Sequence, residues 1–341
     1  MTDALRDALR HHGDVEATEG LVDLAVNVYD EARPTWLDDA LRASLEDVAH
    51  YPNPTRAQQA LAVRHGRDPD EVLATAGAAE AFGLLARLRD WRRPVVVHPQ
   101  FTEPDVALTQ AGCPPDHVLL HHEDGFRLDP TRVPDDADLV VVGNPTNPTG
   151  VLHPATTLRS LARPGRLVVV DEAFIDFVPD EEESLADLAP ADNPLPGLVI
   201  VRSLTKLWSI PGVRAGYLLA SPDVIRDLRD GQAPWSVSTT AAAAMRATAT
   251  DQARGEQERR AARTVTARAV LVDGLSALGI PTVPSRAPFV LARVGEGVHA
   301  RLRSNGWAVR RADTFPGLGP EWVRISVRAP EVTRRFLDAL G

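Results

Sequence analysis

The sequence has few of the features that mark secreted, membrane-spanning or nucleic-acid-binding proteins. It contains one cysteine, Cys113, so no disulfide can form within the chain. No apolar run approaches the roughly 20 residues that a membrane-spanning helix needs, and the N-terminal MTDALRDALRHHGD lacks the apolar segment of a signal peptide. Acidic residues outnumber basic ones, which gives a formal net charge of −10. We therefore expect a cytoplasmic protein that binds neither nucleic acid nor membranes.

The remaining composition is that of an ordinary folded protein. Of the 341 residues, 44% are hydrophobic and 25% are charged, which is typical of globular chains and not of disordered ones. The length exceeds what one small core requires and fits a large domain with a smaller one. We expect an N-terminal arm over residues 1–30, a large domain over 31–250 and a small domain over 251–341.

Short apolar runs predict the central strands of a parallel sheet, at residues 94–98, 118–120, 139–142, 167–170 and 198–201. Polar, helix-capable segments separate most of these runs. This alternation is typical of βαβ units whose sheet is buried on both faces. Residues 75–89 predict a turn rich in glycine and alanine that leads into a helix. The fold class is therefore α/β.

The C-terminal third predicts a smaller α+β unit. Residues 238–250 form an alanine-rich helical segment that we expect to lead the chain out of the large domain. Residues 256–278 predict a long amphipathic helix. Its apolar stripe should consist of Val265, Ala269, Val272 and Leu275. Strands are expected after it, at residues 288–293 and 323–327.

Polar motifs follow three of the predicted strands. GNPTNPTG follows the run at 139–142, Asp171 opens DEAF after the next run, and RSLTK, ending in Lys206, follows the run at 198–201. Because the carboxyl ends of parallel strands lie at one edge of a sheet, where open α/β folds bind ligands, we expect these motifs to meet there.

Together, these motifs supply the groups that pyridoxal 5′-phosphate (PLP) requires. A lysine amine forms a Schiff base with an aldehyde, and a carboxylate can keep a pyridine nitrogen protonated. Hydroxyl groups and a helix N-terminus can hold a phosphate. Taken singly, each group has a plainer interpretation, because Asn-Pro pairs are common turn formers and strand-end aspartates often cap helices.

The ordered motifs NPTNPTG, DEAFIDF and RSLTKLWSIPGVRAGY resemble the fold-type I, aspartate-aminotransferase-like PLP enzymes over nearly the whole chain. The sequence is similar to their histidinol-phosphate aminotransferase branch, which includes the L-threonine O-3-phosphate decarboxylases of cobalamin biosynthesis. The resemblance implies that Lys206 holds PLP as a Schiff base, that Asp171 pairs with the pyridine nitrogen and that Asn147 faces the ring hydroxyl. No metal is expected.

The resemblance also implies further cofactor contacts. Phe101 is expected to stack on the cofactor ring. The PLP phosphate is expected to be bound by Ser203, Thr205, Arg214 and the backbone N–H groups of Ala78 and Ala79. Tyr51, in HYPNP, resembles the family tyrosine that reaches the PLP phosphate of a neighbouring subunit, which implies a homodimer with shared active sites. The alternative for Tyr51 is a turn tyrosine that packs beside two prolines.

Phe174 bears on the choice of reaction. It stands three residues after Asp171, where most aminotransferases of this group have a tyrosine whose hydroxyl bonds the ring oxygen. DEAFIDF, PWSVS and the C-terminal VRRADTFPGLGPEWVRISVR are instead similar to the decarboxylases. This likeness predicts PLP-dependent decarboxylation of L-threonine O-3-phosphate to (R)-1-amino-2-propanol O-phosphate. The alternatives are amine transfer from histidinol phosphate to 2-oxoglutarate and, from another class, a non-catalytic PLP-sensing regulator.

Two arginines near the C-terminus fit a substrate with two anionic groups. Arg324 resembles the residue that forms a forked pair with the substrate α-carboxylate, and Arg310 is expected to bind the substrate phosphate. Asn27 stands where the family keeps an asparagine near the substrate carboxylate. Arg328 is expected to be a surface arginine, and the alternative is a position that faces the site.

The N-terminal HHGD motif gives a weaker indication of the substrate. His12 and Gly13 resemble the decarboxylase segment that folds over the substrate phosphate. Asp14 replaces the second glycine of that segment and adds a negative charge next to the expected phosphate. A surface histidine is the alternative for His12. The expected partner is a small phosphorylated amino acid.

Overall fold

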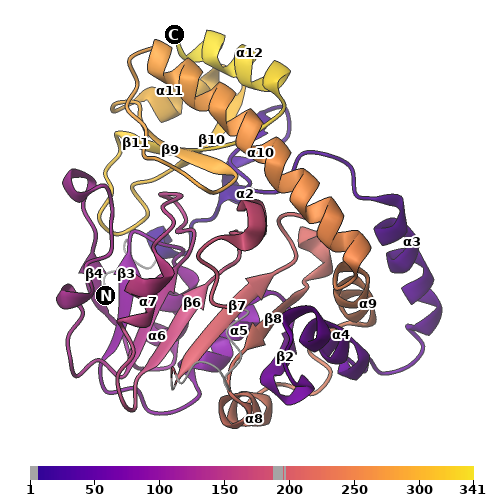
Figure 1. Cartoon of the computed structure of the whole chain (residues 1–341). Helices are drawn as coiled ribbons and strands as arrows, with labels where there is room; N and C mark the ends of the chain where they lie inside the picture. The colour runs from indigo at the N-terminus through magenta and orange to yellow at the C-terminus, as the bar shows by residue number, and fades with distance from the viewer. Residues whose placement is uncertain (1–6, 187–194, 196) are drawn as a thin grey trace.

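The computed structural model describes residues 7–186, 195 and 197–341, and two sheets organise this part of the chain (Figure 1). The larger sheet has seven strands in the order β2-β8-β7-β6-β5-β3-β4, and the smaller has four in the order β1-β10-β11-β9. In Figure 1 the small sheet lies above the large one, and the long helix α10 runs down from it.

The large sheet confirms the predicted α/β class. Its strands are β2 (Val72–Thr75), β3 (Pro94–His98), β4 (Asp116–Leu119), β5 (Leu139–Gly143), β6 (Leu167–Asp171), β7 (Leu198–Ser203) and β8 (Gly216–Leu219). Strands β4, β3, β5, β6 and β7 pair in parallel, whereas β8 is antiparallel to both β7 and β2. The parallel register places Gly143 beside Asp171, and Asp171 beside Val201. The carboxyl ends of three neighbouring strands therefore meet at one edge.

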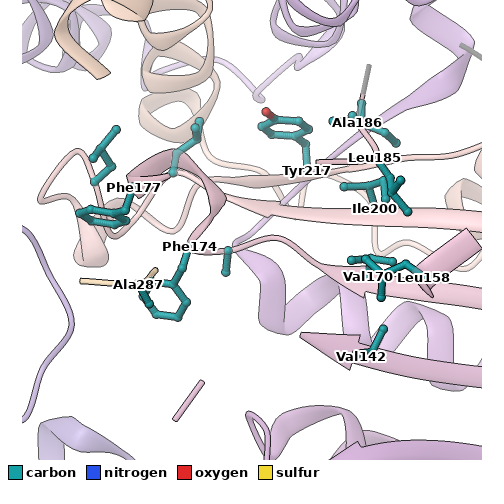
Figure 2. Packing of buried hydrophobic residues seen from close by; sticks show 14 of the residues in the cluster. Val142, Leu158, Val170, Phe174, Phe177, Leu185, Ala186, Ile200, Tyr217 and Ala287 are labelled. Carbon is teal, nitrogen blue, oxygen red and sulfur yellow. The ribbon is translucent and has the colours of Figure 1, made fainter. Parts of the chain in front are cut away.

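Both faces of the large sheet are buried, as the unbroken valine runs require. Val142 and Val141 of β5 belong to hydrophobic clusters on opposite faces. Figure 2 shows Val142, Val170 and Ile200 of three neighbouring strands on the first of these faces. That face packs against α3 (Thr35–Ala43), α4 (Thr55–His65), α7 (Ala155–Arg159) and α9 (Thr239–Thr248). The second face packs against α5 (Ala78–Ala86), α6 (Glu103–Gln110) and α8 (Pro222–Asp230).

The small sheet joins the two ends of the chain. It contains β1 (Val22–Leu24), β9 (Phe289–Arg293), β10 (Trp307–Arg311) and β11 (Trp322–Ser326), accompanied by α2 (Gly13–Glu16), α10 (Asp251–Ala277), α11 (Val298–Ser304) and α12 (Pro330–Leu340). Strand β1 pairs in parallel with β10, so residues 22–24 form an edge of the C-terminal sheet. The N-terminal segment is thus positioned beside the strands that carry Arg310 and Arg324.

The buried face of α10 differs from the predicted apolar stripe. Val265 is 38% exposed, although Leu275 is buried. Polar residues, Arg260 and Arg268 among them, occupy much of the buried face instead. Arg260 donates to Leu207 O at 2.9 Å, and Arg268 donates to Ala287 O at 3.0 Å. The apolar pattern misled because these buried arginines meet backbone carbonyls of the segments that α10 crosses.

Sequence patterns also missed four short strands, β1, β2, β8 and β10. Each has only three to five residues, and β1 and β2 lie at the edges of their sheets. In the described residues, no helix is long and apolar enough to cross a membrane.

Candidate active site

Lys206 lies just beyond the end of β7 and reaches a cavity of about 490 Å³ between the two sheets. Burial, helped by the neighbouring Arg324 and Arg214, lowers the pKa of Lys206 to about 8 against the opposing effect of Asp171. A lysine in this environment becomes a neutral, nucleophilic amine far more readily than one in water.

Lys206 is also the single lysine of the sequence, in which the other 36 of the 37 basic residues are arginine. The presence of a single lysine is a signal for the functional residue that the motifs alone do not give. Any chemistry that needs a lysine side chain must use this residue. A chemical label directed at lysine side chains can therefore report on only one position.

Asp171 ends β6 and faces the same cavity as Lys206. Its Oδ1 accepts a hydrogen bond from Ala173 N at 3.0 Å, and within the described residues no arginine or lysine forms an ion pair with it. Burial raises the pKa of Asp171 to about 6, although that hydrogen bond and Lys206 oppose the shift. The negative charge of this carboxylate is stabilised by one backbone hydrogen bond and by Lys206 nearby. Such a carboxylate can accept a hydrogen bond from a cationic N–H group of a bound cofactor, such as a pyridinium.

An anion-binding cradle lies beside Lys206. Helix α5 begins at Ala78, directly after Gly77, and the N-terminal N–H groups of a helix favour a phosphate. Gly77 has φ +79°, and a Cβ there would lie 2.7 Å from the Arg214 guanidinium. On the other side, Ser203 Oγ and Thr205 Oγ1 are 2.8 Å apart. All the predicted phosphate-binding residues of this chain line the cavity: Ala78, Ala79, Ser203, Thr205 and Arg214.

Arg324, on β11, is fixed by the first segments of the chain and by Asn147. Its guanidinium donates to Asn147 Oδ1 at 2.6 Å and to the carbonyl of Ala25. The Asn27 amide, oriented to donate to Ser326 Oγ, accepts from Arg324 Nη1 at 2.9 Å. A Cβ on Gly13 would lie 2.6 Å from Ala25 O and 3.2 Å from Arg324 Nη2. Gly13 thus lets the N-terminal segment approach Arg324 closely.

Arg310 lines the other part of the cavity and is also held by the N-terminal segment. It donates to the carbonyl of His11 and, at 2.7 Å, to Thr314 Oγ1. Its guanidinium lies 4.7 Å from the centre of the Phe315 ring. Burial lowers the pKa of Arg310 to about 10, so the side chain is still a cation at neutral pH.

Phe101 and His12 lie on the cavity wall, together with acidic residues that motif reasoning did not select as ligands. The His12 and Phe101 rings have centroids 5.6 Å apart. Glu103, the first residue of α6, hydrogen-bonds His12 Nε2 at 2.7 Å. Asp14 lines the same cavity. No motif could have revealed Glu103, because only the fold brings the N-terminal segment next to α6.

Tyr51 is the one predicted site residue that lies outside this cavity. It is 77% exposed, and its ring stacks on Trp235 with centroids 4.4 Å apart. Its expected reach into a neighbouring subunit stays a prediction.

Phe174 lines the cavity and is nearly buried, with its ring set edge-on to Phe289 at 5.0 Å. Figure 2 shows it at the end of the sheet core, near Phe177. Its side chain therefore offers the cavity an apolar surface where a tyrosine would offer a hydroxyl.

Arg328 does not face solvent, contrary to expectation. Its guanidinium donates to Asp23 O at 2.9 Å and to Val26 O at 2.7 Å, and the side chain is only 11% exposed. It ties the N-terminal segment to the end of β11.

A histidine–aspartate cluster lies outside the lining of the cavity. Asp105 Oδ2 is 3.1 Å from His98 Nε2 and 2.5 Å from His117 Nε2. The Gln100 N–H points to His98 Nδ1 at 3.3 Å, which favours the tautomer whose Nε2–H donates to Asp105. The cluster is satisfied as a hydrogen-bond network that links β3, β4 and α6.

Comparisons with known proteins agree with this geometry. A family model described as aminotransferase class I and II matches residues 19–340. A histidinol-phosphate aminotransferase of Mycobacterium tuberculosis is 47% identical over 326 residues, which cover 94% of this chain and 87% of that protein. The threonine-phosphate decarboxylase of Salmonella typhimurium is 31% identical over 334 residues, covering 94% and 90%.

Among solved structures, the aspartate aminotransferase of Thermus thermophilus with maleate is similar with a TM-score of 0.85 and 25% identity. The match covers 99% of this chain and 98% of that one. The family resemblance and the fold predicted from the motifs are confirmed. The chain therefore belongs to the class I and II aminotransferase family, whose members depend on PLP.

Proposed function

We propose that this protein is an aminotransferase that moves an amino group between histidinol phosphate and 2-oxoglutarate. The observation that carries the proposal is the placement of Lys206 in one cavity with Arg324 and Arg310. An amine next to two guanidinium groups suits both partners, because one is a phosphorylated amine and the other carries two carboxylates. The relative at 47% identity supports this reaction over decarboxylation, which the motifs favoured.

The residues at the cofactor end fit PLP, which when bound supplies an electron sink for the carbanion formed at the substrate Cα. Asp171 would hold the protonated pyridine nitrogen, and Asn147 would face the ring oxygen. Ser203, Thr205, Arg214 and the N-terminus of α5 would anchor the phosphate. These residues come from rigid strand ends and a helix end, so little reorganisation is needed when the cofactor binds.

Lys206 has a second task, which is to move a proton at the substrate Cα. Because burial and the neighbouring arginines lower its pKa to about 8, the amine can both accept and return a proton near neutral pH. Arg324, fixed by Asn27 and Asn147, would orient the anionic group of the substrate next to this amine. The orientation decides which bond at Cα breaks, and amine transfer requires the C–H bond.

Decarboxylation of L-threonine O-3-phosphate is the second candidate. Phe174 favours it, since most aminotransferases of the group have a tyrosine at this position, and a relative at 31% identity is named for this activity. In that reaction Arg324 would hold the α-carboxylate and Arg310 the phosphate.

A product assay separates the two reactions. The PLP-loaded protein is incubated with histidinol phosphate and 2-oxoglutarate, and separately with L-threonine O-3-phosphate alone, and products are followed by mass spectrometry. We expect glutamate and the phosphorylated ketone in the first mixture and no CO₂ in the second. CO₂ with aminopropanol phosphate in the second, and no glutamate in the first, would establish the decarboxylase instead. Lys206→Ala is the control for chemistry that does not depend on the site.

A further inference from the structure

The cavity already contains an imidazole, which belongs to the protein itself. His12 Nε2 lies 2.7 Å from Glu103 Oε1. Its ring is tilted by 41° against Phe101, with centroids 5.6 Å apart. Both His12 and Glu103 are partly exposed, at 34% and 27% of their side chains. A carboxylate acceptor and an aromatic ring thus form a slot of the size and chemistry of one imidazole, and it opens into the cavity that holds Lys206.

Hydrogen bonds hold the backbone segments that carry the residues of this slot. Phe101 and Glu103 flank Thr102, whose Oγ1 donates to Leu9 O at 2.5 Å. On the other side, Glu16 is buried and bonded to His299 at 3.2 Å. The backbone around His12 is therefore held at both ends, while the imidazole itself can leave Glu103 by rotating about its side-chain bonds.

The cavity wall carries carboxylates besides Asp171. Glu103, the first residue of α6, pairs with His12, and Asp14 lines the cavity next to His12 and Gly13 in the N-terminal segment. Asp14 is close enough to Lys206 and Arg310 to oppose the shifts of both. A second anionic group placed next to Glu103, which pairs with His12 and not with an arginine, would be repelled. A ring with N–H donors would be attracted, because each N–H can donate to a carboxylate.

We propose that Glu103 accepts a hydrogen bond from the imidazole ring of the amino donor in a subsite next to Phe101, whose expected stacking on the cofactor ring is kept on its other face, and that His12 occupies this subsite until the donor displaces it. The inference rests on the proposed function and adds the orientation of the donor. Its phosphate would lie toward Arg324 and Arg310, and its imidazole toward Glu103. His12 is expected from the resemblance to bind the substrate phosphate. In this proposal its imidazole instead occupies the position of the donor imidazole when no donor is bound.

A purely structural role for the His12–Glu103 pair predicts different behaviour. If the hydrogen bond only held the N-terminal segment in place, removing either partner would have the same effect, and the two effects would not add. If the pair marks a ligand subsite, removing the Glu103 carboxylate weakens binding of the donor. Removing the His12 side chain instead leaves the subsite open and strengthens binding of the donor. The signs of the two effects therefore separate the interpretations.

The test measures the two half-reactions of the PLP-loaded protein by the absorbance change of the cofactor, with histidinol phosphate or with glutamate as donor. Glu103→Gln keeps the shape and removes the charge. We expect it to lower the ratio of kcat/KM for histidinol phosphate to kcat/KM for glutamate by roughly tenfold to a hundredfold, the range for one hydrogen bond to a charged group. His12→Ala should raise that ratio, and Asp124→Asn, an exposed carboxylate outside the cavity, is the matched control.

A ratio that stays within twofold in Glu103→Gln, or that falls equally in Glu103→Gln and His12→Ala, would overturn the subsite. Failure of the proposed function looks different. In that case histidinol phosphate would not convert the cofactor of the unmodified protein at all, whatever glutamate does. Cofactor absorbance and thermal midpoint of each variant confirm that it is folded and loaded.

Discussion

The two ends of the active-site cavity are built in different ways. At the cofactor end, Asp171 and Ser203 end the neighbouring strands β6 and β7, Lys206 follows β7, and the N-terminus of α5 lines the same cavity. At the substrate end, Arg310 and Arg324 come from the small sheet and are held by the N-terminal segment, at His11 and Ala25. One end is therefore encoded in contiguous motifs, whereas the other depends on packing between distant segments. The sequence therefore predicts the cofactor more readily than the substrate, and the substrate end can change while the cofactor motifs stay the same.

Lys206→Ala should cause the largest loss of activity of all the changes considered. Without the amine there is neither a covalent anchor nor a base at the substrate Cα, and we expect activity to fall by roughly 10³-fold or more. Borohydride reduction followed by intact-mass measurement checks the anchor, since the sequence has no other lysine. Retention of a reducible cofactor by the variant would show that Lys206 is not the attachment point.

Asp171→Asn should be the next most damaging change. The neutral amide keeps the size of the side chain but cannot hold a positive charge on the ring nitrogen, so we expect kcat to fall by roughly 10²- to 10³-fold. The bound cofactor should still be present, as its absorbance would show. Full activity with normal cofactor absorbance would mean that Asp171 is only a structural residue of β6.

The pH dependence of cofactor capture reports on the environment of Lys206. Burial and two arginines lower its pKa to about 8, and only the neutral amine is nucleophilic. The rate at which cofactor-free protein captures PLP should therefore rise about tenfold per pH unit up to pH 8 and then level off. A rate that keeps rising beyond pH 9, as for a solvated lysine, would contradict the buried position.

Arg328→Ala should affect the substrate end alone. It removes the donors to Asp23 O and Val26 O, so the segment that supports Arg324 loosens. We expect KM for both substrates to rise about fivefold and the free energy of unfolding to fall by about 1–3 kcal/mol. PLP affinity should change less than twofold. An equal loss of PLP affinity would show that the two ends are not separable, and Arg334→Ala, an exposed arginine of α12, is the control.

Phe174→Tyr should have the smallest effect. The added hydroxyl would reach the position from which most aminotransferases of the group bond the ring oxygen. We expect the pH titration of the bound cofactor's absorbance to move toward lower pH, while kcat changes less than threefold. A gain of amine transfer at the expense of CO₂ release would instead identify Phe174 as the residue that selects decarboxylation.

The cofactor end could be predicted from the sequence for a physical reason. Parallel strands that are buried on both faces have continuous apolar sequences, here runs of valine, and polar motifs follow the ends of these strands. Asn147, Asp171 and Lys206 could therefore be assigned to one edge of the sheet from the sequence alone. The parallel register confirms that β5, β6 and β7 lie side by side.

The substrate end could not be predicted in the same way. The pairing of β1 with β10, the contact of Arg328 with the N-terminal backbone, and the approach of His12 to Glu103 join residues that are 91 or more positions apart in the chain. Local patterns carry no signal for such contacts. The buried arginines of α10 show the same limit, since their partners are backbone carbonyls that no side-chain pattern reveals.

The most direct test is a single-turnover experiment with the PLP-loaded protein and histidinol phosphate, without any oxo acid. We expect one cofactor per chain to change from the aldehyde to the stable amine form, and 2-oxoglutarate to restore the original absorbance with formation of one glutamate. An unchanged cofactor with histidinol phosphate, together with repeated CO₂ release from L-threonine O-3-phosphate, would contradict amine transfer and assign the cavity to decarboxylation.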